Sequence, residues 1–277
     1  MIFNSPIITA QELYQNLNNS SLIILDCTID KVGQSIDKEN LETIPTARFF
    51  DLEEKFSDHS NSLPHTLVTE VTFTKEAQTL GINKNSVIVC YDRWGIYSSP
   101  RVWWMFKTMG HENIFVLNGG LPEWKKHHFS TETSHFISTE KGDFIADFQE
   151  DWYADKQIML NIINDESKII IDARSEGRFN GVAPEPRQGI RSGHIPTSKN
   201  LFFENVLDGE KFKSKEELIS IFDKLSNPTK ENVFSCGSGI TASILALAST
   251  VADFDKVRVY DGSWSEWGAD DSLPIEK

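Results

Sequence analysis

One cysteine of this chain stands where a nucleophile would be placed. Cys236 follows the apolar run "NVFS" and precedes "GSGIT", after which an apolar, helix-like run begins. The backbone N–H groups of such a turn and of the following helix N-terminus can converge into an anion-binding concavity, which stabilises a thiolate over a thiol. A Gly-rich turn also has little packing reason to hold a thiol. We therefore predict that Cys236 is a reactive nucleophile.

The other two cysteines, Cys27 and Cys90, have a different setting. Both lie inside apolar, strand-like runs, where a free cysteine is most often a small buried hydrophobe. The three cysteines lie far apart and form no CxxC pair, which argues against a disulfide framework and against a clustered zinc site. We predict that Cys27 and Cys90 are structural, that the protein needs no metal or other cofactor, and that its compartment is reducing.

Four of the eight arginines fall in one segment, 174–191, although the chain as a whole is acidic. This segment follows an apolar run and contains two prolines and three glycines, so we predict a shaped loop at the ligand-binding edge of a sheet. Arginine suits bidentate recognition of a carboxylate. For Arg174, beside Asp172, a structural ion pair is an equal alternative. The four residues are Arg174, Arg178, Arg187 and Arg191.

These residues belong to a chain that repeats itself. The run "VLNGGLPEW" matches "VYDGSWSEW", "LIILD" matches "KIIID", and "IPTARFF" matches "IPTSKNLFF", in the same order in both halves. Gly95 in the first half matches Gly239 in the second. Such a repeat indicates two domains built on one plan. We predict domains at 1–129 and 149–277, joined by a linker at 130–148.

Short apolar runs alternate with helix-like runs in both halves. The apolar runs "LIIL", "SVIVCY" and "IFVL", then "KIIID", "NVFS" and "VRVY", are typical of strands covered on both faces of a mainly parallel sheet. Helix-like runs lie between them, over 72–81 and 98–110 and over 213–226 and 239–254. This alternation predicts an α/β fold in each half, with a mainly parallel sheet flanked by helices.

The first half supplies an internal control for the cysteine loop. When Gly95 is matched with Gly239, Asp92 takes the place of Cys236. A carboxylate is not a soft nucleophile, and we do not expect it as the guest of an anion cradle. We predict that the first domain is catalytically silent. We expect Arg93, Trp94 and Tyr97 of its loop in the wall of an interdomain cleft, and for the two aromatic residues plain packing is an equal alternative.

The composition excludes some partners. With 41 acidic and 27 basic side chains, the net charge of −14 opposes the neutralisation of phosphates on which nucleic-acid binding depends. The N-terminus has no basic segment followed by a continuous apolar stretch, and no window approaches the roughly 18 apolar residues of a membrane span. We predict a soluble, cytoplasmic protein that binds neither nucleic acid nor membranes.

Several motifs occur in register with one family. The runs "DARSEGRFNG", "PEPR", "SGHIP", "CGSGITA" and "DGSWSEW", with "SPRVWWMF" and "LNGGLPEW" before them, closely resemble the two-domain rhodanese-like sulfurtransferases. The resemblance covers nearly the whole chain. It implies two tandem rhodanese-like domains and an enzyme that carries sulfur as a persulfide of Cys236.

Within this family the loop after the cysteine separates two branches. The thiosulfate branch carries two cationic residues there, whereas the 3-mercaptopyruvate branch carries CGSGVT, and this chain has CGSGIT. The resemblance therefore implies 3-mercaptopyruvate as the sulfur donor and pyruvate as a product. A thiosulfate:cyanide sulfurtransferase and a non-catalytic rhodanese-like binding module are the alternatives.

Carried over motif by motif, the resemblance implies a role for each site residue. Cys236 would accept the sulfur, and Ser238 would act as the loop hydroxyl. Arg178 and Arg187, nine residues apart, would bind the carboxylate and the carbonyl of the donor. The remaining loop residues would contact the substrate and the persulfide, and they are Gly237, Gly239, Ile240 and Thr241.

The resemblance also implies contributors from the first domain. In this branch the serine is proposed to act with a histidine and an acidic residue. His65 matches the histidine, although Pro64 stands where the family has Asp, and Glu53 or Glu54 takes the acidic position because "FDLEEKFSD" is one residue longer than usual. A thiol, thioredoxin or cyanide would accept the sulfur.

Other enzyme classes fit less well. A cysteine-dependent phosphatase has an arginine six positions after its cysteine, and position 242 is Ala. A GxSxG elbow around Ser238 is missing, which argues against a serine hydrolase. Neither HExxH nor CxxC is present, and His127 and His128, next to two lysines, indicate a solvated helix end rather than metal ligands.

Overall fold

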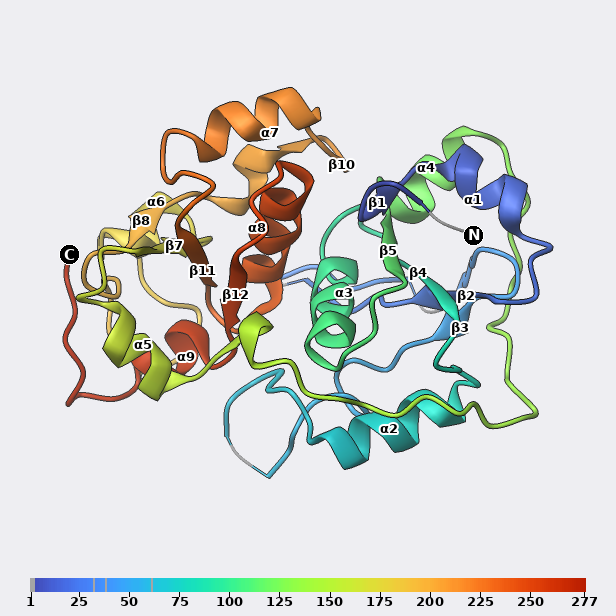
Figure 1. The fold of residues 1–277 in the computed structure, drawn as a ribbon, viewed down its shortest axis with the longest axis horizontal. Coiled ribbons are helices and arrows are strands. Elements are labelled where there is room, and N and C mark those ends of the chain that lie inside the picture. The colour runs from blue at the N-terminus through green and yellow to red at the C-terminus, as the bar shows by residue number, and fades with distance from the viewer. Residues whose placement is uncertain (1–2, 32, 38, 61) are drawn as a thin grey trace. The chain divides into compact units, whose positions relative to one another are not determined.

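The computed structural model of the chain describes residues 3–31, 33–37, 39–60 and 62–277, which divide into two compact units (Figure 1). The first unit contains the chain up to Ser57, Leu67–Gln149 and Gly209–Phe212. The second contains Asp58–Thr66, Glu150–Asp208 and Lys213–Lys277. Each unit thus includes a short segment from the other half of the sequence. The predicted domain boundaries stay a prediction.

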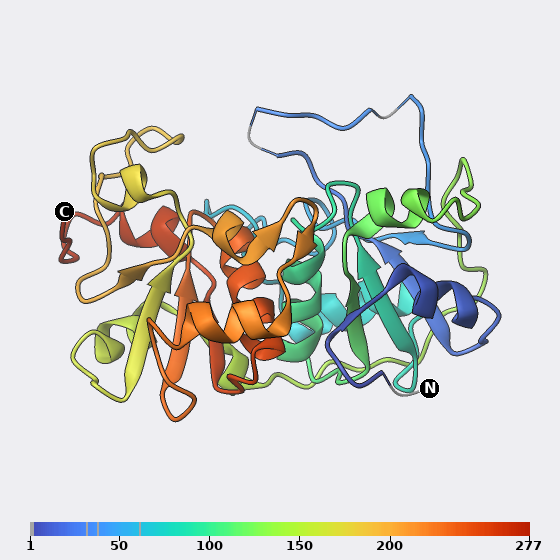
Figure 2. The ribbon, with the colours of Figure 1, turned by 90° about the horizontal axis from the view of Figure 1, so that it is seen from above.

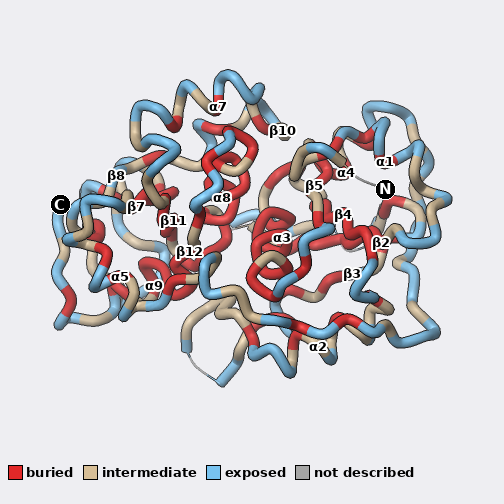
Figure 3. The backbone as a smooth tube through the Cα atoms, viewed as in Figure 1, coloured by how far each residue is buried: buried red, intermediate tan, exposed pale blue. Residues whose placement is uncertain are grey.

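The first unit is built on a five-stranded parallel sheet of order β1-β5-β4-β2-β3. The central strand β4 is buried along its whole length, because helices cover both faces (Figures 1 and 3). Helices α1 and α4 cover one face, and α2 and α3 cover the other. The strands are β1 (Ile7–Ile8), β2 (Leu22–Asp26), β3 (Arg48–Phe49), β4 (Val87–Tyr91) and β5 (Ile114–Leu117), and the helices are α1 (Ala10–Asn16), α2 (Glu70–Thr79), α3 (Ser99–Thr108) and α4 (Gly120–Lys126).

The two faces of this sheet have different cores. Under α1 and α4 the core is mainly aliphatic and includes Leu13, Val89 and Trp124. On the other face, aromatic rings pack edge to face, as Phe73 does on Phe106 at 5.0 Å between ring centroids. Alternate residues of each strand point to opposite faces, so a strand between two cores must be apolar throughout. This explains the unbroken apolar runs.

Residues 130–148, predicted as a linker, run along the first unit. Their backbone pairs with that unit at several points, as Phe136 N–H does with the Ala47 carbonyl at 2.8 Å and Phe144 N–H with the Ile82 carbonyl at 3.1 Å. The Phe144 side chain is buried in the aromatic core. The segment is therefore a packed part of the first unit along most of its length.

The second unit repeats this plan with a parallel sheet of order β6-β12-β11-β7-β8 (Figure 2). Helix α8 packs on β11 and β12 from one face, and α5 and α9 cover the other. The strands are β6 (Tyr153–Ala154), β7 (Lys168–Asp172), β8 (Lys199–Asn200), β11 (Glu231–Ser235) and β12 (Val257–Tyr260), and the helices are α5 (Lys156–Ile162), α6 (Glu176–Phe179), α7 (Lys215–Phe222), α8 (Ile240–Val251) and α9 (Ser263–Trp267). Short elements complete the chain: η1 (Glu150–Trp152), η2 (Phe203–Val206), β9 (Leu207–Asp208) and β10 (Lys211–Phe212).

The predicted fold class is confirmed, because each unit is an α/β sandwich around a mainly parallel sheet. All six predicted strands and all four predicted helices are present. The shorter helices were not predicted individually, since four to seven residues give little periodicity to detect. In the ranges that the structure describes, no helix combines the length and apolar character needed to cross a bilayer.

Candidate active site

Three loops of the second unit meet at one edge of its sheet. They follow β7, β11 and β12, which are parallel neighbours, so their carboxyl ends lie side by side. Ser235 pairs with Asp172, and the cysteine loop begins one residue later. Open α/β sheets bind ligands at this edge, where the next helices begin. Cys236 thus occupies the position that the sequence predicts.

The cysteine loop turns its donors toward the sulfur. Cys236 is 2% exposed, and its Sγ accepts a hydrogen bond from Gly239 N–H at 3.1 Å. Gly239 has φ +82°, a left-handed conformation that favours glycine, and it is the N-cap residue of α8. Among the residues that the structure describes, the N–H groups of 240–242 have no hydrogen-bond partner. These free donors of the first turn form an electropositive site beside the thiol.

A turn after β12 holds the backbone of the cysteine loop. Cys236 N–H donates to Ser263 Oγ at 3.2 Å, and Trp264 N–H donates to the Cys236 carbonyl at 2.9 Å. Ser265 N–H donates to the Gly237 carbonyl at 3.0 Å. Both peptide groups of the reacting residue are therefore fixed from outside the loop. The sequence did not single out Ser263 and Ser265, although they differ from their matched positions in the first half, which are Gly120 and Pro122.

Of the two arginines expected to bind the donor, Arg178 approaches Gly237 directly and Arg187 reaches it through Ser265. A Cβ atom at Gly237 would lie 3.3 Å from Nη2 of Arg178. The Arg178 guanidinium also pairs with Glu185 at 2.5 Å. Arg187 is exposed and donates from Nη1 to Ser265 Oγ at 3.2 Å. A carboxylate bound between these guanidinium groups would lie close to the cysteine loop.

The other two arginines of the segment are structural. Arg174 is 2% exposed, pairs with both oxygens of Asp172, and lies over the Trp264 ring at 4.2 Å. It also donates to Glu185 at 2.8 Å, so this carboxylate links Arg174 to Arg178. Arg191 donates to backbone carbonyls between 267 and 273. Of the two alternatives for Arg174, the structural ion pair is therefore the one observed.

Ser238 lies beside a histidine from the first half of the sequence. His65 belongs to the segment Asp58–Thr66, which folds with the second unit, and its Nδ1 lies 3.2 Å from Ser238 Oγ. The proton between them sits on either atom, depending on the histidine tautomer. Glu53 belongs to the first unit, where it lines a cavity of about 330 Å³ together with Arg93 and His135. The predicted partnership of Glu53 or Glu54 with His65 stays a prediction.

The matching loop of the first unit carries its own anion. One oxygen of the buried Asp92 carboxylate accepts hydrogen bonds from the N–H groups of Tyr97, Ser98 and Ser99 at 2.9–3.1 Å and from the Ser99 hydroxyl at 2.7 Å. The other oxygen accepts from Trp94 N–H at 3.0 Å. Our expectation that a carboxylate would not be the guest of such a cradle is wrong. The aspartate side chain is short enough to turn back into its own loop.

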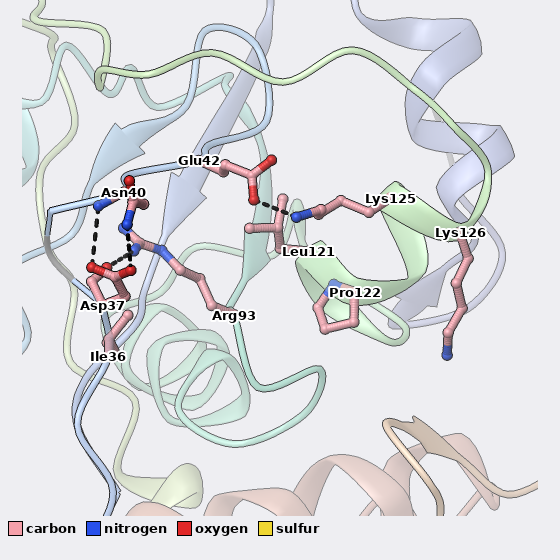
Figure 4. Close-up of a pocket in the computed structure, with 9 residues that line it drawn as sticks. All are labelled: Ile36, Asp37, Asn40, Glu42, Arg93, Leu121, Pro122, Lys125 and Lys126. Atoms are coloured by element: carbon pink, nitrogen blue, oxygen red, sulfur yellow. Dashed lines mark hydrogen bonds and ion pairs between the residues drawn. The ribbon is translucent and has the colours of Figure 1, made fainter.

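Next to this loop the first unit has a cavity of about 560 Å³ (Figure 4). Lys125 pairs there with Glu42, and Arg93 donates to the Asp37 carbonyl at 3.4 Å and to Asp26 at 3.4 Å. Its acidic and basic groups are thus largely matched with one another. Of the two loop aromatics, Trp94 donates from its ring to the Ile29 carbonyl at 2.8 Å, a packing contact within the unit.

The remaining cysteines are buried. Cys27 and Cys90 have no exposed surface, and burial raises the pKa of the Cys27 thiol well above its ordinary value. Both observations fit the predicted structural role. His127 and His128 are exposed at the end of α4. Within the described ranges, no group of three or more His, Cys, Asp or Glu side chains is arranged to hold a metal ion.

Comparisons with known proteins agree with this geometry. The model of the rhodanese-like domain matches residues 9–127 and again 155–270. A thiosulfate/3-mercaptopyruvate sulfurtransferase of Arabidopsis thaliana is 38% identical over 99% of this chain and 78% of its own length. The 3-mercaptopyruvate sulfurtransferase of Escherichia coli K12 is 35% identical over 96% of both chains.

Solved structures show the same likeness. The crystal structure of SseA from Escherichia coli superposes with a TM-score of 0.84 at 32% identity, covering 94% of this chain and 99% of that one. Tum1 from Saccharomyces cerevisiae superposes with a TM-score of 0.89 at 27% identity, covering 99% of each chain. The predicted resemblance is confirmed: with two copies of the domain, the chain belongs to the rhodanese-like sulfurtransferase family.

Proposed function

We propose that this protein transfers the sulfur of 3-mercaptopyruvate through a Cys236 persulfide to a thiol acceptor and releases pyruvate. The relatives with this name cover nearly the whole chain. The observation that carries the proposal is the setting of Cys236, whose sulfur accepts a loop N–H while Arg178 approaches the next residue and Arg187 reaches that residue through Ser265.

The first half-reaction uses the thiolate of Cys236 as nucleophile. It attacks the sulfur of 3-mercaptopyruvate, an S–S bond forms, and the C–S bond breaks with its electron pair passing to the carbon. The departing group is the enolate of pyruvate, which takes up one proton. Arg178 and Arg187 bind the donor's carboxylate and carbonyl and stabilise the charge that develops on the enolate.

The persulfide then waits for an acceptor. Its outer sulfur would lie among the free N–H groups of 240–242 and next to the Gly239 N–H. A thiolate attacks this sulfur, the S–S bond breaks, and Cys236 leaves as a thiolate. A small thiol, thioredoxin or cyanide serves as acceptor in this proposal. The predicted cytoplasmic location stays a prediction.

In this proposal Ser238 delivers the proton to the enolate. Its hydroxyl lies in the cysteine loop and contacts His65, which can return a proton to it after each turnover. His65 has a backbone φ of +59°, an uncommon conformation for a residue other than glycine. The acidic partner, Glu53 or Glu54, remains part of the proposal.

The test is sulfur transfer by the purified protein. Intact-mass spectra after incubation with 3-mercaptopyruvate should show one added sulfur atom on the wild type and none on Cys236→Ser. The value of kcat/KM should be higher for 3-mercaptopyruvate than for thiosulfate on the same preparation. An adduct that persists in Cys236→Ser would move the chemistry to another cysteine, and a preference for thiosulfate would favour the other branch.

A further inference from the structure

A serine outside the cysteine loop connects the two parts of the site. Ser265 is 6% exposed and donates to the Gly237 carbonyl twice, from its N–H at 3.0 Å and from its Oγ at 2.5 Å. The Oγ atom of Ser265 also accepts a hydrogen bond from Nη1 of Arg187. In the part of the chain that the structure describes, this is the only hydrogen bond that Arg187 makes.

The first unit serves as a natural control for these contacts. Pro122 matches Ser265 there, and proline has neither an N–H nor a hydroxyl. The neighbouring backbone contact is kept, because Leu121 N–H donates to the Asp92 carbonyl at 3.1 Å as Trp264 N–H does to Cys236. The fold of the turn therefore does not need a serine at this position. The contacts of Ser265 exist in the unit that has the cysteine.

Charge makes the position of Arg187 important. Arg178 shares Glu185 with Arg174, so its charge is already partly matched. No ion pair joins Arg187 to any residue in the described ranges. A guanidinium has five N–H donors, and a single one is used on Ser265. The carboxylate of a donor would therefore depend mainly on Arg187.

We propose that Ser265 is a positioning residue that sets the distance between Arg187 and the cysteine loop, and that it thereby favours reagents with a carboxylate. Its hydrogen points to the Gly237 carbonyl, so the lone pairs of Oγ face Arg187. Two hydrogen bonds, from Arg187 to Ser265 and from Ser265 to Gly237, then fix the position of the Arg187 guanidinium relative to the cysteine loop. The choice of 3-mercaptopyruvate as the reagent rests on the function proposed above.

Alkylation of Cys236 tests this without any turnover. Iodoacetate carries a carboxylate, iodoacetamide does not, and both alkylate a thiolate. Ser265→Ala should lower the ratio of the iodoacetate to the iodoacetamide rate roughly tenfold, as expected for a hydrogen bond to a charged group. Arg187→Met should lower the same ratio. Adding Ser265→Ala to Arg187→Met should then change nothing further, because Ser265 acts through Arg187.

Turnover gives a second readout with matched controls. Ser265→Ala should raise the KM for 3-mercaptopyruvate roughly tenfold with a smaller change in kcat. If the alanine variant does not fold, Ser265→Thr and Ser265→Val replace it in the test, because they have the same shape and only Thr keeps the hydroxyl. Ser265→Thr should behave like wild type, and Ser265→Val should show the loss expected of Ser265→Ala. Ser263→Gly, which copies Gly120, should affect both alkylating reagents alike, since Ser263 contacts Cys236 N–H and not Arg187.

The outcomes separate the two proposals. If the wild type does not release sulfur from 3-mercaptopyruvate but the iodoacetate ratio falls in Ser265→Ala, the proposed function is wrong and the role of Ser265 stands. If the ratio is the same in wild type, Ser265→Ala and Ser265→Val, the role of Ser265 is wrong whatever the substrate. An equal further loss from Ser265→Ala in the Arg187→Met background would likewise overturn it.

Discussion

Replacing Asp92 by Asn should destabilise the first unit far more than an ordinary Asp-to-Asn change. The buried carboxylate accepts five hydrogen bonds, four on one oxygen and one on the other. The amide keeps one acceptor oxygen, which can serve the group of four without the help of charge. Its NH₂ group then faces Trp94 N–H, so that donor loses its partner.

The magnitude follows from these contacts. A hydrogen bond to a charged group contributes about 1 kcal/mol more than a neutral one, and an unsatisfied buried donor costs about 1–3 kcal/mol. Four weakened bonds and one lost partner give a loss of about 5–7 kcal/mol in the free energy of unfolding. The amide escapes the cost of burying a charge, which offsets part of this. We expect a net loss of about 3 kcal/mol, a large share of the 5–15 kcal/mol typical of a domain.

Urea unfolding of wild type, Asp92→Asn and a matched control would measure it. Asp147→Asn is suitable, because Asp147 is an exposed residue of the same unit, and it should change the stability by less than about 0.5 kcal/mol. Hydrogen exchange should accelerate at the amides of 97–99 in Asp92→Asn. If the free energies of unfolding of Asp92→Asn and wild type agree within about 1 kcal/mol, the carboxylate does not hold this loop together.

Three further predictions concern charge and reactivity. Burial tends to raise the pKa of Asp26, but hydrogen bonds from His135 and Thr28 and the charge of Arg93 lower it overall. The ionised form of Asp26 therefore stabilises the fold above about pH 4, and this contribution is lost as the pH falls further. The urea midpoints at pH 7 and pH 3 should differ less in Asp26→Asn than in wild type, and equal differences would argue against the effect. In native protein at neutral pH, peptide mass spectrometry should find Cys27 unmodified by iodoacetamide while Cys236 reacts, and Cys27 should react once urea unfolds the chain; equal rates in the native protein would contradict the burial argument. Two cations at Gly237 and Ser238 should raise kcat/KM for thiosulfate relative to 3-mercaptopyruvate by at least about tenfold, because thiosulfate is a dianion; an unchanged ratio in the folded Gly237→Arg, Ser238→Lys variant would show that loop charge does not set the choice of donor.

The sequence predicted what depends on local pattern. Cys236 could be placed at the end of a buried strand because the strand, the turn and the helix each have a clear signature in neighbouring residues. The repeat added that both halves share one plan, but the order of the strands in each sheet was not predicted. The local pattern could not show which arginines have their charge matched by an acidic side chain. That depends on Glu185, which pairs with Arg174 and Arg178 but not with Arg187.

The error at Asp92 has a physical cause as well. Chemical type alone favours solvent for a carboxylate, but the direction of this side chain and the convergence of four N–H groups favour burial. Ser265 escaped notice for a similar reason, because a serine near a helix start is common. What distinguishes Ser265 is its two hydrogen bonds to the Gly237 carbonyl, which Pro122 at the matching position cannot form.

The exchange of short segments between the halves has a consequence for any attempt to divide the chain. A cut near residue 149 would produce an N-terminal fragment without Gly209–Phe212 and a C-terminal fragment without Asp58–Thr66. The C-terminal fragment would keep the thiol, Arg178 and Arg187 but lack His65, the neighbour of Ser238. Restoring a complete site would then require fragment complementation, in which the N-terminal fragment supplies the segment Asp58–Thr66. The sequence repeat therefore does not mark a point at which the chain can be cut into two complete units.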